Sequence, residues 1–223
     1  MPRRKTPLIN NQFYHIFNRT IDGKEIFTNK KIVKRALTTL FYYQYQNPPL
    51  RLSYFLEKSK EEQEKIWETL KQKNEKLIEI IAYSLMPNHY HLQIKQLVNN
   101  GISVFISKFQ NSFTKFFNTL TNRSGHLFES QFKAKIILNE EDFIHINRYI
   151  HLNPYTSFLI KNIEDLKNYF ASSLPEYFDE KQGFCEKSLV LSHFKNLNDY
   201  WQFIKNQADY QRKLNQIKHL TFE

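Results

Sequence analysis

The chain has 223 residues, of which 41% are hydrophobic and 16% aromatic, and this composition supports one large domain with a buried core. Its formal net charge of +10 favours a polyanionic partner, nucleic acid before membrane, and its four glycines form neither a dinucleotide-binding nor a Walker-type loop. The single cysteine, Cys185, excludes an internal disulfide framework and a cysteine-rich zinc module.

The start of the chain is basic, and no apolar segment follows it. No stretch approaches the ~18 apolar residues that a membrane span requires. We therefore expect a cytoplasmic protein that has no membrane partner. Residues 1–10 are expected to form a flexible basic arm.

Strand and helix patterns alternate in the first third of the chain. Residues 13–19 have the composition of a first strand. Asn29 is expected to cap a helix that runs to about Tyr45, because apolar residues then recur at helical spacing. Residues 50–76 are rich in lysine and glutamate with a narrow apolar stripe, which indicates an exposed amphipathic helix or insertion.

The middle of the chain predicts two strands and a long helix. Residues 77–85 form a strongly apolar strand, residues 86–88 make a short break, and residues 89–95 form the next strand. The two strands form either a hairpin or one bent strand. The helix that follows is expected over residues 101–120, with phenylalanines along its buried face.

A further strand and helix complete the pattern. Residues 132–138 predict the strand, and Asn139 is expected to cap a helix whose acidic first turn suits the positive helix end. This helix is expected to stop at about Asn153, because the residue before Pro154 avoids the α conformation. Residues 155–223 carry weaker helical patterns.

The order strand, helix, strand, strand, helix, strand predicts an α+β fold. It matches a ferredoxin-like split βαβ antiparallel sheet with helices on one or both faces. A mainly helical C-terminal extension is expected to follow it.

Two histidines flank a tyrosine in His89-Tyr90-His91, inside a strand-like run. Alternate side chains of a strand point to opposite faces, so both imidazoles project from one face, about 7 Å apart. Imidazole is a common ligand for divalent metals, and the spacing predicts that the pair grips one ion. We expect this pair to face solvent and to contribute little to the core.

Polar residues on the helix before Pro154 supply a second half of the site. Tyr149 and Asn153 are four residues apart and therefore share a helix face, with His145 one turn earlier and Arg148 adjacent. The Asn153 amide oxygen is a hard ligand that suits Mg²⁺ or Mn²⁺. The alternative is that Tyr149 is a core aromatic residue and Asn153 makes only local hydrogen bonds.

Four blocks of sequence carry a family resemblance. They are FYHIFNR at 13–19, LMPNHYHL at 85–92, GHLFESQFKA at 125–134 and RYIHLNP at 148–154. In this order the chain resembles the REP-associated tyrosine transposases, which are single-tyrosine HUH endonucleases (histidine, hydrophobic residue, histidine). The resemblance covers residues 8–212. The chain departs from the family in its long charged stretch at 50–76.

The resemblance implies a role for each matching residue. Tyr149 matches the nucleophile, and His89, His91 and Asn153 match the metal ligands, with Mg²⁺ or Mn²⁺ as the cofactor. It implies that single-stranded DNA, often beside a small hairpin, is nicked and rejoined through a covalent 5′-phosphotyrosine. It also implies either a dimer or a monomer, since relatives exchange the nucleophile helix between subunits whereas those with a C-terminal extension act alone.

The resemblance also divides the chain. A single-tyrosine transposase domain is expected over residues 11–160, interrupted by the charged insertion at 50–76. Residues 161–223 are the expected C-terminal helical extension. DNA contacts are expected mainly from basic side chains, and the candidates are Arg3, Arg4, Lys5, Arg19, Lys133, Lys135 and Arg148.

Two other classes of function fit parts of the pattern. A non-catalytic nucleic-acid-binding protein on the same scaffold would not need Tyr149. A metal phosphodiesterase that uses water would tolerate loss of Tyr149 but not of His89. The presence of both histidines, Tyr149 and Asn153 together favours the nicking and joining enzyme.

Overall fold

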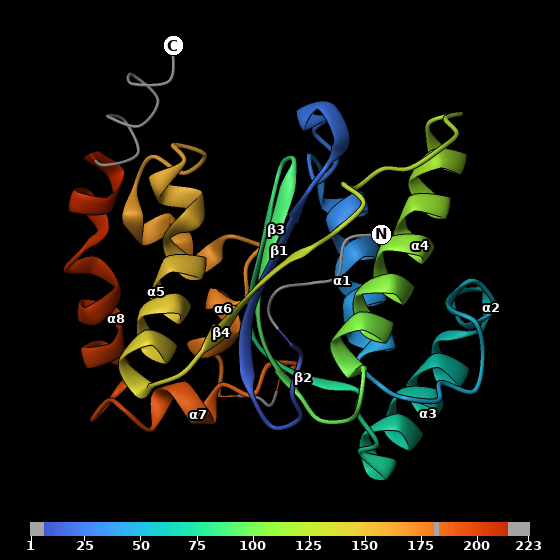
Figure 1. Cartoon of the computed structure of the whole chain (residues 1–223), viewed down its shortest axis with the longest axis horizontal. Helices are drawn as coiled ribbons and strands as arrows, with labels where there is room; N and C mark the ends of the chain where they lie inside the picture. Colours follow the sequence, from blue (N-terminus) through green and yellow to red (C-terminus); the bar gives the residue numbers. More distant parts are fainter. Residues whose placement is uncertain (1–6, 181–182, 214–223) are drawn as a thin grey trace.

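The computed structural model describes residues 7–180 and 183–213. A four-stranded antiparallel sheet lies at its centre, with strands β1 (Phe13–Arg19), β2 (Ile78–Met86), β3 (His89–Gln96) and β4 (Lys133–Ile137) in the order β2-β3-β1-β4. This strand order, with helices between β1 and β2 and between β3 and β4, confirms the predicted ferredoxin-like α+β fold (Figure 1).

Two helices cover one face of the sheet, α1 (Lys30–Tyr43) and α4 (Gly101–Leu120). Phe105, Phe109, Phe113 and Phe117 recur every four residues along α4 and are buried, as the spacing predicts for one helix face. Across the residues that the structure describes, no helix is long and apolar enough to cross a membrane.

Helices also cover the opposite face, so the sheet lies between two helical layers (Figure 1). The second layer contains α5 (Glu140–Thr156), η2 (Ile163–Asn168), α6 (Leu174–Tyr177), α7 (Ser188–Leu191) and α8 (Leu197–Lys205). One buried cluster joins Ile81 of β2 and Leu152 of α5 to Leu174, Tyr177 and Tyr200 of the C-terminal segment. The C-terminal segment therefore completes the hydrophobic core on this face.

The charged segment at 50–76 is helical, as expected, with α2 (Leu52–Glu57) and α3 (Lys60–Lys73). Ser59 and Glu62 form a capping box at the start of α3, where each side chain binds the other residue's backbone N–H. A small core beneath the two helices contains Tyr42, Tyr45, Leu52, Phe55 and Leu70. This core attaches the insertion to the end of α1.

Strands β2 and β3 form a hairpin, which decides between the two alternatives left by the sequence. Met86 pairs with His89, so the connection contains only Pro87 and Asn88. The carbonyl of Pro87 accepts a hydrogen bond from the Ile26 N–H, at 2.7 Å. The hairpin end is therefore held against the segment that follows β1.

The predicted end of α5 at Asn153 is wrong, because the helix continues through Pro154 to Thr156. A proline lacks the N–H of one helical hydrogen bond, but Pro154 lies close to the helix end, where little of the ladder remains to be broken. The Asn153 carbonyl still accepts a hydrogen bond from the Ser157 N–H, at 3.0 Å. Burial of Tyr155 and Thr156 stabilises the additional residues.

Candidate active site

The strand β3 places His89 and His91 on the sheet face that α5 covers, and Tyr90 on the opposite face. The Tyr90 ring is buried against Phe109, with ring centroids 5.4 Å apart. The rings of His89 and His91 lie 5.1 Å apart and almost perpendicular. The predicted alternation is confirmed, and the two imidazoles are neighbours.

His91 is 7% exposed, so the expectation that the pair faces solvent is wrong for this residue. The reason is that α5 lies over the strand, and the predicted alternation contains no information about what covers a sheet face. His89 is only half-buried. The two histidines therefore differ in how much they contribute to the stability of the fold.

A third histidine, His15, for which the sequence predicted no role, belongs to the same cluster. The strand register puts His91 of β3 opposite Phe17 of β1, and His15 reaches it diagonally. His15 Nε2 and His91 Nδ1 share a hydrogen bond of 2.9 Å, and their rings stack with centroids 5.1 Å apart. The sequence could have indicated His15, because it lies in the strand at 13–19, two residues before Phe17 and therefore on the same sheet face.

The Nδ1 atoms of both paired histidines are engaged. His89 Nδ1 forms a hydrogen bond of 2.7 Å with the Asn88 side-chain oxygen, and because that oxygen only accepts, the proton lies on Nδ1. His91 Nδ1 is engaged by His15. Neither Nε2 atom makes a hydrogen bond to the described residues, so each imidazole can offer Nε2 to a ligand.

All three imidazoles are held in the neutral form. Burial lowers the pKa of His89, and burial together with His15 and His89 lowers the pKa of His91 well below its ordinary value. Burial, followed by the charge of Lys135, lowers the pKa of His15 to about 4. A neutral imidazole is the form that binds a metal ion.

Tyr149 of α5 lies directly over this histidine cluster. Its ring meets His91 edge to face at 5.5 Å between centroids, and it meets His15 at 5.7 Å. The Tyr149 side chain is 38% exposed, so solvent or a substrate can reach it. The structure therefore brings together the tyrosine and the histidines that the sequence singled out.

Asn153 lies one turn after Tyr149 and is buried. Its Nδ2 atom has no hydrogen-bond partner among the described residues, which is unusual for a buried amide. Within these residues, no group of three or more His, Cys, Asp and Glu side chains is arranged to hold a metal ion. A metal site here would therefore need the Asn153 amide beside the two histidines.

Hydrogen bonds fix α5 against the sheet. The Gln93 side chain of β3 donates to the Phe143 carbonyl at 2.8 Å and accepts from Asn147 Nδ2 at 3.1 Å. Tyr200 of α8 donates to Asn147 Oδ1 at 2.8 Å. The side chains of Gln93, Asn147 and Tyr200 are fully buried. Their hydrogen bonds fix the distance between α5, which carries Tyr149, and the sheet.

Arg148 and His145 contact each other and Phe203 instead of the histidine cluster. The Arg148 guanidinium stacks on the Phe203 ring at 4.3 Å and is buried, and it binds His145 Nδ1 at 2.9 Å. The Arg148 side chain is therefore buried in this structure, and its contact with DNA stays a prediction. The neighbour that captures it, Phe203, lies 55 residues further along the chain.

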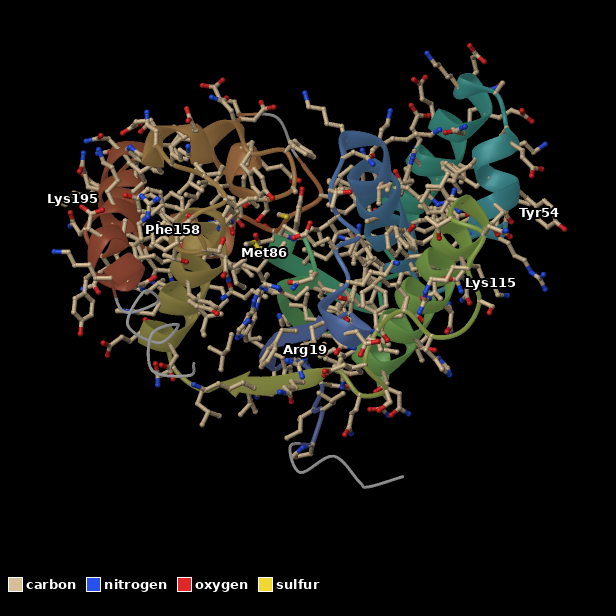
Figure 2. The ribbon with its side chains drawn as sticks, turned by 90° about the horizontal axis from the view of Figure 1, so that it is seen from above. Arg19, Tyr54, Met86, Lys115, Phe158 and Lys195 are labelled. Atoms are coloured by element: carbon tan, nitrogen blue, oxygen red, sulfur yellow. The ribbon has the colours of Figure 1, made fainter. Side chains whose placement is uncertain are left out.

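Three other predicted basic residues lie on the face that carries the histidine cluster. Arg19 pairs across the strands with His89, and Lys135 pairs with His15. Lys133 lies two residues from Lys135 on the same face, and all three are exposed. Arg19 also forms an ion pair with Glu129. Figure 2 shows Arg19 at the sheet, between the two helical layers. Arg3, Arg4 and Lys5 lie outside the described residues.

Comparison with one solved structure supports the fold. Over 79% of this chain and 84% of the other, it is similar to a REP-associated tyrosine transposase bound to a REP hairpin, with 14% identity and a TM-score of 0.52. It also matches a transposase-like protein from Deinococcus radiodurans R1 over 67% of this chain and 95% of the other, at 12% identity and a TM-score of 0.36.

Sequence comparison gives the family. No curated protein is significantly similar to the chain. The model of the IS200-like transposases matches residues 9–153, which include both histidines of the pair and Tyr149. This match spans well over half of the chain and confirms the family predicted from the four sequence blocks: the chain belongs to the IS200-like transposase family.

Proposed function

We propose that this transposase cuts and rejoins single-stranded DNA through Tyr149, with a divalent metal ion held by His89, His91 and Asn153. The observation that carries the proposal is the contact of the Tyr149 ring with His91. A hydroxyl nucleophile that solvent can reach then lies against a buried imidazole of the metal-binding type.

The residues present suit a divalent ion. Both imidazoles are neutral, and hydrogen bonds to Nδ1 orient each ring with Nε2 available. The Asn153 amide, whose buried Nδ2 atom has no hydrogen-bond partner among the described residues, would supply its oxygen as the third ligand. Mg²⁺ or Mn²⁺, when bound, would polarise an oxygen of the scissile phosphate.

The chain's own residues would then carry the bond exchange. The Tyr149 oxygen forms a bond to phosphorus, and the bond from phosphorus to the 3′ oxygen breaks. That oxygen takes a proton and leaves as a 3′-hydroxyl, while the phenolic proton passes to the solvent that reaches Tyr149. The product is a 5′-phosphotyrosine, which keeps one phosphate ester for each ester broken, so a second 3′-hydroxyl can reverse the step without ATP.

The substrate would lie along β4 and β1. Arg19, Lys133 and Lys135 present three cations on the same face as the histidine cluster, which suits the phosphates of one strand. The Lys133 ammonium lies 5.9 Å from the Phe17 ring, so an aromatic surface is present beside the charges. The similar transposase bound to a REP hairpin supports a hairpin beside the cut strand.

A covalent-adduct assay tests the proposal. Purified protein is mixed with labelled single-stranded DNA that carries a hairpin, with Mn²⁺ or with a chelator, and denaturing gels separate free from attached DNA. We expect an adduct only when Mn²⁺ is present, and only with single-stranded DNA and not with duplex DNA. An adduct that forms equally well in the chelator would contradict the metal, and cleavage without any adduct would point to water as the nucleophile.

A further inference from the structure

A groove lies on the outer side of the α1–α4 layer, far from the Tyr149 cluster. Its volume is about 1010 Å³, and its walls are α1, α4 and the segment at 48–53 that leads into α2. In Figure 1, α2 and α4 lie on the opposite side of the sheet from α5. Figure 2 likewise places Lys115, which lines the groove, on the side opposite Phe158 and Lys195.

The charged side chains that line the groove are all basic. Arg35, Arg51, Lys108 and Lys115 line it, and no aspartate or glutamate does. None of these four side chains forms an ion pair with the described carboxylates. Uncompensated cations that line one groove attract a polyanion.

Aromatic side chains lie among these charges. Tyr43 and Phe116 line the groove and are each half-buried. The Arg35 guanidinium lies 5.0 Å from the Phe116 ring, and its buried Nε has no hydrogen-bond partner among the described residues. Cations interleaved with partly exposed rings are the arrangement that binds unpaired bases, because each ring can stack on a base while the cations contact the phosphates.

We propose that this groove binds a second segment of single-stranded DNA, remote from the strand that is cut at Tyr149. The inference rests on the proposed function only in taking DNA as the partner, and it requires neither the metal site nor the nucleophile. The insertion contributes one wall, through Leu50, Arg51 and Ser53. The insertion thereby gains a role in holding DNA.

Two sites on opposite sides of the molecule predict a dependence on DNA length. A strand long enough to pass around the sheet engages both sites at once and gains from their linkage. A strand of about 10 nucleotides, roughly one single-strand site, engages only one of them. We therefore expect the groove to matter for long oligonucleotides and not for cleavage of the shortest substrates.

Charge reversal inside and outside the groove tests the inference. Fluorescence anisotropy measures binding of labelled oligothymidine, in a chelator so that the metal site does not contribute. The groove variant is Arg51→Glu with Lys115→Glu, and the control is Lys60→Glu with Lys65→Glu, which changes the net charge equally on exposed residues of α3. Thermal melting verifies that both variants fold.

We expect the groove variant to lose about tenfold in affinity for a long oligothymidine and the control to lose far less. The slope of log affinity against log salt should fall by about 1.4 in the groove variant, since each single-strand phosphate contact contributes about 0.7. Equal losses in the two variants would overturn the proposal, because general charge would then explain the binding.

A second pair of measurements separates the groove from the Tyr149 chemistry. Phe116→Leu should weaken binding of oligothymidine but not of an abasic strand of equal length, which has no bases to stack. Tyr149→Phe should leave the groove contribution intact while abolishing the adduct. If Phe116→Leu weakens both strands equally or neither, base stacking in the groove is refuted; if only the adduct assay fails, the proposed function is wrong and the groove stands.

Discussion

His15 Nε2 and His91 Nδ1 lie 2.9 Å apart, joined across the two central strands of the sheet. For His91 to offer the Nε2 lone pair to a metal ion, its Nδ1 must donate its proton to His15. At the proposed metal site we therefore expect His15 to act as a positioning residue, which would fix the tautomer and the ring angle of His91.

Replacement of His15 should weaken metal binding without abolishing it. His15→Phe keeps a ring of similar size but removes the acceptor, so we expect Mn²⁺ affinity to fall about 10- to 100-fold. Isothermal titration calorimetry measures the change. His145→Phe is the matched control, because His145 contacts Phe203 and Arg148 instead of the cluster. Unchanged affinity in His15→Phe would remove the positioning role.

The two histidines of the pair should differ in stability but not in metal binding. His89→Ala and His91→Ala are each expected to abolish Mn²⁺ binding and cleavage. His91→Ala should also lower the free energy of unfolding by about 1–3 kcal/mol, because it leaves the buried His15 without its partner. His89→Ala should lower the free energy of unfolding by less, because His89 is only half-buried. Urea denaturation measures both, and retained Mn²⁺ binding in the double variant would exclude this metal site.

Tyr149→Phe should abolish the covalent adduct while leaving DNA binding intact. It removes one oxygen from a side chain that is 38% exposed and keeps the ring contacts with His15 and His91. Tyr155→Phe on the same helix is the control, since its hydroxyl binds Asp209. Mass spectrometry of the trapped wild-type complex should locate the nucleotide on Tyr149. Continued cutting by Tyr149→Phe would assign the attack to water or to another tyrosine.

Truncation after residue 160 should prevent stable folding. The cluster that joins Ile81 and Leu152 to Leu174, Tyr177 and Tyr200 would be exposed, and Asn147 would lose two partners. We expect the truncated chain to aggregate or to lack a cooperative thermal transition. A soluble, cooperatively folded truncated protein would show instead that residues 161–223 are a separable extension.

Alkaline pH should destabilise the insertion core. Tyr42 is fully buried and donates to the Leu50 carbonyl at 2.7 Å, and burial raises its pKa to about 12. The unfolded chain releases this proton near pH 10, so the stabilisation is complete below pH 10 and is lost as pH rises toward 12. The loss is roughly 3 kcal/mol over that window. Unfolding at several pH values, compared with Tyr42→Phe, measures it; an equally steep decline in Tyr42→Phe would assign it elsewhere.

Local patterns were sufficient to predict most elements. Asn29 and Asn139 cap α1 and α5 as expected, because a cap is formed by residues three positions apart. The common face of His89 and His91 could be predicted because strand alternation is also a local pattern. The sequence did not decide whether β2 and β3 form a hairpin or one bent strand, because residues 86–88 permit either a turn or a bend.

Contacts between distant segments could not be predicted from the sequence. The partnership of His15 with His91 depends on the register of two strands that are separated by the insertion. The orientation of Arg148 depends on Phe203, and the height of α5 depends on Gln93 meeting Asn147. Among these residues, only His91 and Arg148 were singled out from the sequence, and only the packed fold shows which side chains they meet.

Asn147 accepts a hydrogen bond from Tyr200 on one side and donates to Gln93 on the other. Helix α5, which carries Tyr149, is thereby tied to β3, which carries the histidine pair, and to α8. If Tyr149, His89, His91 and Asn153 act as proposed, one molecule would contain both the nucleophile and the metal ligands, and no exchange of helices between copies would be required. We expect the rate of DNA attachment per molecule to be independent of dilution, so that the total rate in a cell would rise in proportion to the amount of this protein and not to its square.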